Sequence, residues 1–103
     1  MIYEDVYSAI DPTAENIRRL GEYAPFTLPV INKLREVDDK KVSTDYLNMV
    51  VDLYNANNLI IDTIGEAFTL AAKDNEQGIA NFLADRDGQH KKWRWQMKAI
   101  LKR

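Results

Sequence analysis

The stretch that decides the fold is residues 46–71, which read YLNMVVDLYNANNLIIDTIGEAFTLA. One mostly apolar row follows alternating steps of four and three residues, which is the period of an α-helix and excludes a strand. This row consists of Tyr46, Val50, Leu53, Asn57, Ile60, Ile64, Ala67 and Ala71. A neighbouring apolar row widens the stripe, so we expect a long helix that packs on more than one neighbour. Ser43 is the expected N-cap, and Thr44 or Asp45 would serve within the usual boundary error.

A second long helix is expected from about residue 77 to the C-terminus. Asp74 and Gln77 have the spacing of a capping box, which predicts Asp74 as the N-cap of this helix. Apolar side chains then recur at helical spacing, interrupted by the polar residues Arg86 and His90. Because the link between the two long helices is short, they should be antiparallel.

The N-terminal third also has a helical period, and Gly21 is a natural C-terminal stop. The periodic residues are Ile2, Val6, Ile10, Ala14, Ile17 and Leu20. Pro12 either begins a fresh helix with Asp11 as its cap or sits inside one continuous bent helix, and we expect the second arrangement. Pro25, Pro29 and a charged run before residue 42 indicate a crossing segment with a short helix near residues 30–35.

These elements predict an all-α fold in a single domain over residues 1–103. We expect three long antiparallel helices of about 18, 29 and 26 residues and a short crossing helix, as in a helical bundle whose fourth helix is missing. Such a set leaves an apolar groove that a lone copy cannot cover. We therefore expect a homo-oligomer.

Composition excludes several classes of protein. The chain has 103 residues, 14 basic and 16 acidic side chains and a net charge of -2, so it lacks the basic field of a nonspecific nucleic-acid binder. It has no cysteine, which excludes disulfides, thiolate metal sites and cysteine nucleophiles. The longest apolar run, Leu59-Ile60-Ile61, is far too short to span a membrane, and no signal peptide is apparent. We expect a soluble cytoplasmic protein without a membrane partner.

Asp11 and Glu15 are the first candidate for chemistry. Their spacing of four residues places both carboxylates on one face of a helix, where they repel each other unless a cation lies between them. Hard oxygen ligands at this spacing suit Fe, Mn, Mg or Ca. Pairs of acids at this spacing are also common on solvated helix faces, so the spacing alone leaves both interpretations open.

Three other polar or aromatic features have a functional and a structural interpretation. Asp87 and His90 weakly resemble the carboxylate–histidine pairs of di-iron bundles, but His90 is the only histidine, and we expect a neighbouring carboxylate or carbonyl to hold its ring. Asn57 and Asn58 are expected to fix register between helices. Trp93 and Trp95 lie among six C-terminal bases, and we expect buried indoles and helix-end charges rather than a nucleic-acid or membrane face.

Two stretches resemble one family. Residues 11–21, DPTAENIRRLG, followed by Tyr23-Ala24-Pro25, resemble the D-x-x-A-E-R-I-R-x-L-G…Y-A-P segment of the Dps-type mini-ferritins, the DNA-binding proteins from starved cells. Residues 90–101, HKKWRWQMKAIL, resemble their C-terminal H-x-K-x-x-W-x-L-R-A-x-L pattern. Asn16 departs from the first pattern, where Arg is usual. The likeness implies a ferritin-like bundle that lacks the N-terminal helix, as in an N-terminally truncated member.

The resemblance implies that Asp11 and Glu15 are iron ligands of a ferroxidase site built across a two-fold subunit interface. The implied activity is oxidation of Fe(II) by peroxide or oxygen, with iron storage and protection against oxidative stress. The family's histidine ligands belong to helices upstream of residue 1, so the site in this chain should be incomplete and its iron binding weak or absent. The alternative is a catalytically silent helical module for self-association. The family also suggests a dimer or larger cage, and DNA binding that the charge of this chain does not favour.

Overall fold

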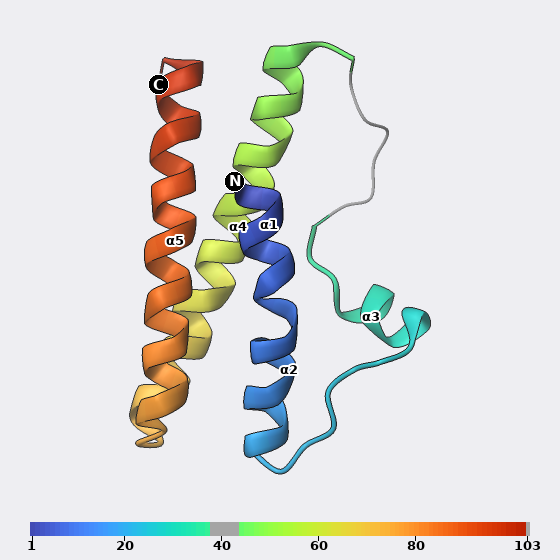
Figure 1. Cartoon of the computed structure of the whole chain (residues 1–103), viewed down its shortest axis with the longest axis vertical. Helices are drawn as coiled ribbons and strands as arrows, with labels where there is room; N and C mark the ends of the chain where they lie inside the picture. The colour runs from blue at the N-terminus through green and yellow to red at the C-terminus, as the bar shows by residue number, and fades with distance from the viewer. Residues whose placement is uncertain (38–43, 103) are drawn as a thin grey trace. The chain divides into compact units, whose positions relative to one another are not determined.

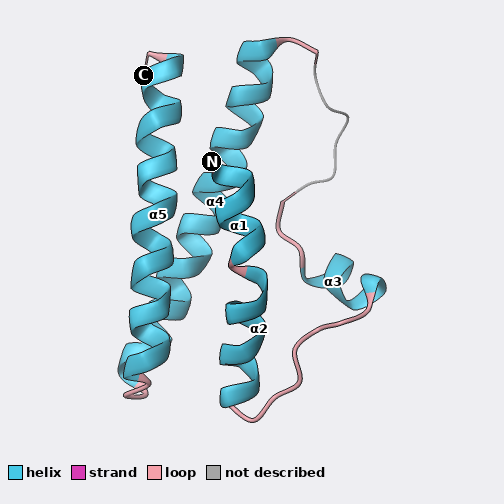
Figure 2. Ribbon diagram, viewed as in Figure 1, coloured by secondary structure: helices cyan, strands magenta, loops and turns pink. Residues whose placement is uncertain are grey.

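The structure is a computed structural model that describes residues 1–37 and 44–102. All regular elements within these residues are helices, which confirms the all-α prediction (Figure 2). They are α1 (Ile2–Ser8), α2 (Ile10–Arg19), α3 (Leu28–Leu34), α4 (Tyr46–Lys73) and α5 (Gln77–Leu101). The chain divides into two compact units, residues 1–36 and residues 37–103, and each is described by itself.

In the first unit, the predicted continuous N-terminal helix is interrupted at Ala9, which lies between α1 and α2. Figure 2 shows a short loop segment between these two helices. Pro12 explains the break, because it has no N–H to donate to the carbonyl of Ser8 and its ring crowds that carbonyl. Hydrogen bonding continues around the break, from Ala9 N to Val6 O at 3.1 Å and from Thr13 N to Ala9 O at 3.0 Å. Ala9 therefore occupies the N-cap of α2, and the alternative cap, Asp11, lies inside the first turn.

The end of α2 and the position of α3 are as predicted. Gly21 has a φ of 89°, the left-handed conformation that glycine adopts without steric cost, and its N–H bonds the carbonyl of Arg18 at 3.0 Å. The short helix α3 begins two residues before the predicted start. Pro29 lies in its first turn, where a missing N–H leaves no helical hydrogen bond unmade.

In the second unit, α4 and α5 lie side by side and run antiparallel, as predicted (Figure 1). Asp45 is the N-cap of α4, since its Oδ2 accepts a hydrogen bond from Asn48 N at 3.3 Å. Ser43, the first of the expected caps, lies outside the described residues. The two helices have 28 and 25 residues, close to the expected lengths.

The link between α4 and α5 differs from the predicted capping box. Asp74 ends α4, and Asn75 adopts a φ of 60°, the left-handed conformation that asparagine tolerates. Glu76 N bonds Ala71 O at 2.9 Å and Asn75 N bonds Ala72 O at 3.2 Å, which is the Schellman arrangement of a helix C-terminus. Asp74 is therefore not the N-cap of α5. Glu76 holds that position without a side-chain cap bond.

Few apolar side chains of the described residues are buried, namely Ile61, Ala80 and Met97. Many large ones are exposed on helices of both units, among them Tyr7, Leu34, Leu47, Leu70 and Trp95. Among the described residues, large apolar side chains that are exposed therefore outnumber the buried ones. In the described part of the chain, no helix is long and apolar enough to cross a membrane.

Candidate functional site

Asp11 and Glu15 both lie on α2 and are both exposed. They are separated by one helical turn, so the structure places the two carboxylates on the same side of the helix, as predicted. Asp11 also lies in the first turn of α2, where a negative charge interacts favourably with the helix dipole. The helix thus gives Asp11 a local structural role that is independent of any metal.

The pair supplies two potential oxygen ligands for a metal ion. Two carboxylates are suitable hard ligands for iron, but one helix face supplies only these two. Among residues 1–37 and 44–102, no group of three or more His, Cys, Asp or Glu residues could hold a metal ion. Further ligands for iron would have to come from beyond these residues, as from a second copy of the chain.

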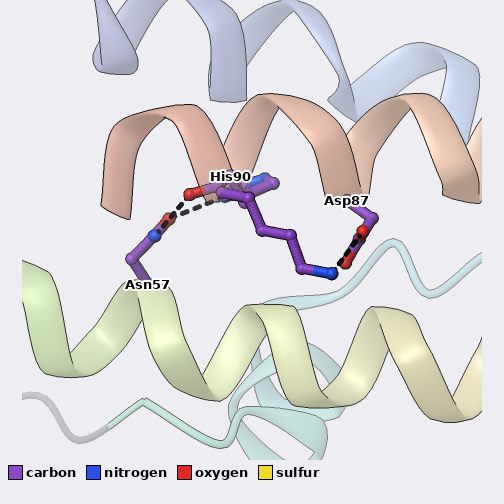
Figure 3. Close-up of polar contacts among 4 residues, drawn as sticks. Asn57, Asp87 and His90 are labelled. Carbon is purple, nitrogen blue, oxygen red and sulfur yellow. Dashed lines mark hydrogen bonds and ion pairs between the residues drawn. The ribbon is translucent and has the colours of Figure 1, made fainter. Parts of the chain in front are cut away.

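A buried polar pair, rather than a metal centre, occupies the middle of the α4–α5 pair. Asn57 of α4 and His90 of α5 are only 2% and 3% exposed. Asn57 Nδ2 donates to the backbone carbonyl of His90 at 2.8 Å, and Asn57 Oδ1 lies 2.8 Å from His90 Nδ1 (Figure 3). Asn57 therefore binds both the main chain and the ring of His90, which fixes the height of one helix against the other.

Arg86 completes this polar chain, which we define as Arg86, His90 and Asn57. Arg86 Nη2 lies 2.8 Å from His90 Nε2, and a guanidinium can only donate, so Nε2 is the acceptor. The carbonyl of His90 can only accept, so the amide nitrogen of Asn57 must face it and Oδ1 must face Nδ1. Nδ1 therefore carries the proton, and the imidazole is neutral.

Asp87 and His90 do not form a joint metal site. The Asp87 carboxylate points away from the ring to an ion pair with Lys91, at 2.9 Å from Oδ2 to Nζ (Figure 3). Both ring nitrogens of His90 are hydrogen-bonded within the polar chain. The expected structural role of His90 is confirmed, with the side-chain carbonyl of Asn57 as its partner.

The sequence predicted a structural role for Asn57 and for His90, but it did not predict that the two side chains bind each other. They lie at nearly equal distances from the turn at Asp74 and Asn75, one before it and one after it. Residues at equal distances from a tight turn lie at the same level in an antiparallel helix pair. Their equal distance from the turn could therefore have predicted the contact between Asn57 and His90. Asn58 differs from its neighbour, because its buried Oδ1 has no hydrogen-bond partner within the described chain.

The two tryptophans of α5, which were both expected to be buried, differ in exposure. The indole of Trp95 is not buried as expected, since the residue is 66% exposed, whereas Trp93 is half-buried.

Asn16, which stands where the family pattern usually has Arg, is buried. Its Nδ2 donates to Pro12 O at 2.9 Å and its Oδ1 accepts from Arg19 Nη1 at 3.3 Å, so it supports α2 by local hydrogen bonds.

Comparison with known proteins agrees with this helical architecture. The family model described as a ferritin-like domain matches residues 2–103. A comparison with curated proteins found no significant match. Because the family model covers nearly the whole chain, the protein belongs to the ferritin-like domain family.

Proposed function

We propose that this chain is an iron-binding protein of the Dps type, whose inherited activity is Fe(II) oxidation in iron storage and protection against oxidative stress. The observation that supports this proposal is the position of Asp11 and Glu15, one turn apart on the exposed side of α2. The D-x-x-A-E resemblance gives this pair the role of iron ligands. Iron is the substrate here, and peroxide or oxygen would accept its electrons.

The carboxylates would act as hard anionic ligands that favour Fe(III) over Fe(II) and so assist the loss of an electron. Two of them cannot fill the coordination sphere of iron. The proposal therefore includes a second copy that contributes ligands at an interface, or weak binding where no such ligands exist.

The test is an anaerobic calorimetric titration with Fe(II) or Co(II), in the presence and absence of free imidazole. We expect weak binding that imidazole strengthens, because α2 carries two carboxylates but no histidine, and imidazole supplies a nitrogen donor. The double variant Asp11→Asn/Glu15→Gln should abolish this binding. A ferroxidase assay on the same samples measures Fe(II) oxidation.

A matched control is available on α4. Asp62 and Glu66 are exposed and have the same spacing of four residues, so Asp62→Asn/Glu66→Gln removes the same charges from a similar helix face. This control should leave binding unchanged. Tight stoichiometric binding that survives Asp11→Ala, an equal loss in the control, or no binding in either condition would each overturn the assignment to Asp11 and Glu15.

A catalytically silent module for self-association is the second candidate. The exposed apolar side chains favour it, because Leu70 on α4 and Leu34 on α3 are 63% and 62% exposed, while within residues 1–37 and 44–102 only three apolar residues are buried. Light scattering coupled to size exclusion would then report an oligomer, and the ferroxidase assay would report no activity. A stable monomer would contradict this candidate.

A further inference from the structure

The exposed indole of Trp95 lies beside three cations on one side of α5. A hollow of about 520 Å³ is lined by Lys91, Arg94, Trp95, Lys98 and Ala99, which we call the α5 patch. All five residues belong to α5, and Trp95 is 66% exposed. A buried indole would have explained Trp95 by packing, and its exposure leaves it accessible to a ligand. We propose that the α5 patch binds a nucleoside polyphosphate, whose aromatic ring stacks on Trp95 while its phosphates bind the cations.

The cations and the indole occupy adjoining sides of the helix. At about 100° per residue, Lys91, Arg94 and Lys98 fall within about 60° of one another around α5. Trp95 and Ala99 follow on the adjoining side and are about 40° apart. A ligand with a flat ring at one end and negative charge at the other can therefore contact both groups at once.

The charge of this part of α5 favours phosphates. Residues 88–102 include five basic side chains and no acidic one, although the whole chain has a net charge of -2. Within the part of the chain that the structure describes, Arg94 and Lys98 form no ion pair, whereas Lys91 Nζ lies 2.9 Å from Asp87 Oδ2. Guanidinium and ammonium groups bind phosphate oxygens by charge-assisted hydrogen bonds. We therefore expect Arg94 and Lys98 to hold the phosphates and Lys91 to contribute less.

Ala99 keeps the indole of Trp95 accessible. Side chains of a helix lean towards its N-terminus, so the residue four positions after Trp95 lies over part of its ring. That residue is Ala99, whose single methyl group covers little. The other indole differs, because Lys92 Nζ lies over the ring of Trp93 at 5.6 Å from the centroid. Trp95 therefore provides the uncovered ring that stacking on a base requires.

Other anionic partners fit the α5 patch less well. A lipid surface requires a broad apolar face, whereas the α5 patch has two apolar residues, Trp95 and Ala99. Duplex nucleic acid keeps its bases stacked on one another, and the net charge of -2 does not favour its phosphates. A single strand offers both accessible bases and phosphates, so the experiment has to distinguish it from a nucleotide.

Binding can be followed by ¹H–¹⁵N NMR of the whole chain in metal-free buffer, so the result does not depend on iron binding. The two tryptophans give two indole signals, which Trp95→Phe assigns. The probes are ATP, adenosine and inorganic tripolyphosphate, each titrated to millimolar concentration. ATP should shift the indole signal of Trp95 more than that of Trp93, and it should bind more tightly than adenosine or tripolyphosphate.

Four results of this titration would overturn the proposal. They are no binding of ATP, equal affinity for ATP and tripolyphosphate, equal affinity for ATP and adenosine, and a shift confined to Trp93. Preference for a single-stranded oligonucleotide over ATP, in direct competition at equal nucleotide concentration, would also overturn it and would favour strand binding instead.

Variants separate stacking from charge. Ala99→Leu fills the hollow beside Trp95 without removing a charge, so ATP affinity should fall at least about fivefold while tripolyphosphate affinity stays the same. Arg94→Gln/Lys98→Gln should weaken both ligands, and this loss should shrink as salt is added. Lys92→Gln removes a charge of α5 outside the patch and should leave both affinities unchanged. Equal losses of ATP affinity in Ala99→Leu and Lys92→Gln would overturn the assignment, and the titration of the unmodified chain decides the proposal even if a variant does not fold.

Discussion

Asn57 and His90 are 33 residues apart in the chain and exchange two contacts of 2.8 Å across the α4–α5 pair. Both are buried, so each polar atom would lose water without gaining a partner if the other residue were absent. The pair therefore specifies one register between two helices whose apolar rows alone would permit sliding by a turn.

The first prediction concerns this register. Asn57→Ala leaves the Nδ1 proton of His90 without an acceptor, so the free energy of unfolding should fall by about 2 to 3 kcal/mol. Urea unfolding followed by tryptophan fluorescence measures it, because both tryptophans lie on α5. Asn55→Ala, on the exposed side of the same helix, is the control and should be neutral or stabilising by up to about 0.5 kcal/mol. Equal losses at the two positions would contradict the register role.

The second prediction distinguishes the observed helix link from a capping box. Asn75→Ala forces a β-carbon into the left-handed conformation without the favourable asparagine side chain and should cost about 1 kcal/mol. Asp74→Ala should change stability by less than about 0.5 kcal/mol, because Asp74 caps no helix N-terminus. A loss of about 1 kcal/mol at Asp74 would instead support the capping box. Chemical unfolding of the two variants side by side decides between them.

The third prediction is a pair of glycine substitutions with opposite signs. A β-carbon at Gly21 or at Gly65 would meet no atom within 4 Å apart from its chain neighbours and, at Gly65, the backbone of its own helix, so the two sites differ in backbone conformation. Gly21→Ala should destabilise by about 1 kcal/mol, because φ is 89°. Gly65→Ala lies inside α4 and should stabilise by about 0.8 kcal/mol. Thermal unfolding monitored by far-ultraviolet circular dichroism would show both, and effects of the same sign would refute the conformational argument.

The fourth prediction concerns the break at Ala9. Pro12→Ala restores an N–H that can donate to Ser8 O, so α1 and α2 should join and the helical signal at 222 nm should rise. Pro29→Ala is a matched control, because Pro29 lies in the first turn of α3 and its N–H has no helical acceptor. If both substitutions raise the helical signal equally, the interruption has another cause than Pro12.

Local interactions explain which features the sequence could predict. The lengths of α4 and α5 follow from apolar periodicity, the stop at Gly21 follows from backbone freedom, and α3 follows from the proline spacing. The shared face of Asp11 and Glu15 likewise requires only a helix through residues 10–19. These features depend on residues within one or two turns of each other, so their physical causes are present in any short window of the chain.

Tertiary structure decided what depends on distant residues. Asn57 and His90 were each visible as polar residues in apolar rows, but their two contacts exist only because the turn at Asp74 and Asn75 brings them to the same height. The exposure of Trp95 and the neutral state of His90 depend in the same way on which side of α5 is covered by α4. Burial and hydrogen-bond satisfaction are properties of packed helices, and a helical period determines which residues share a face but not what covers that face.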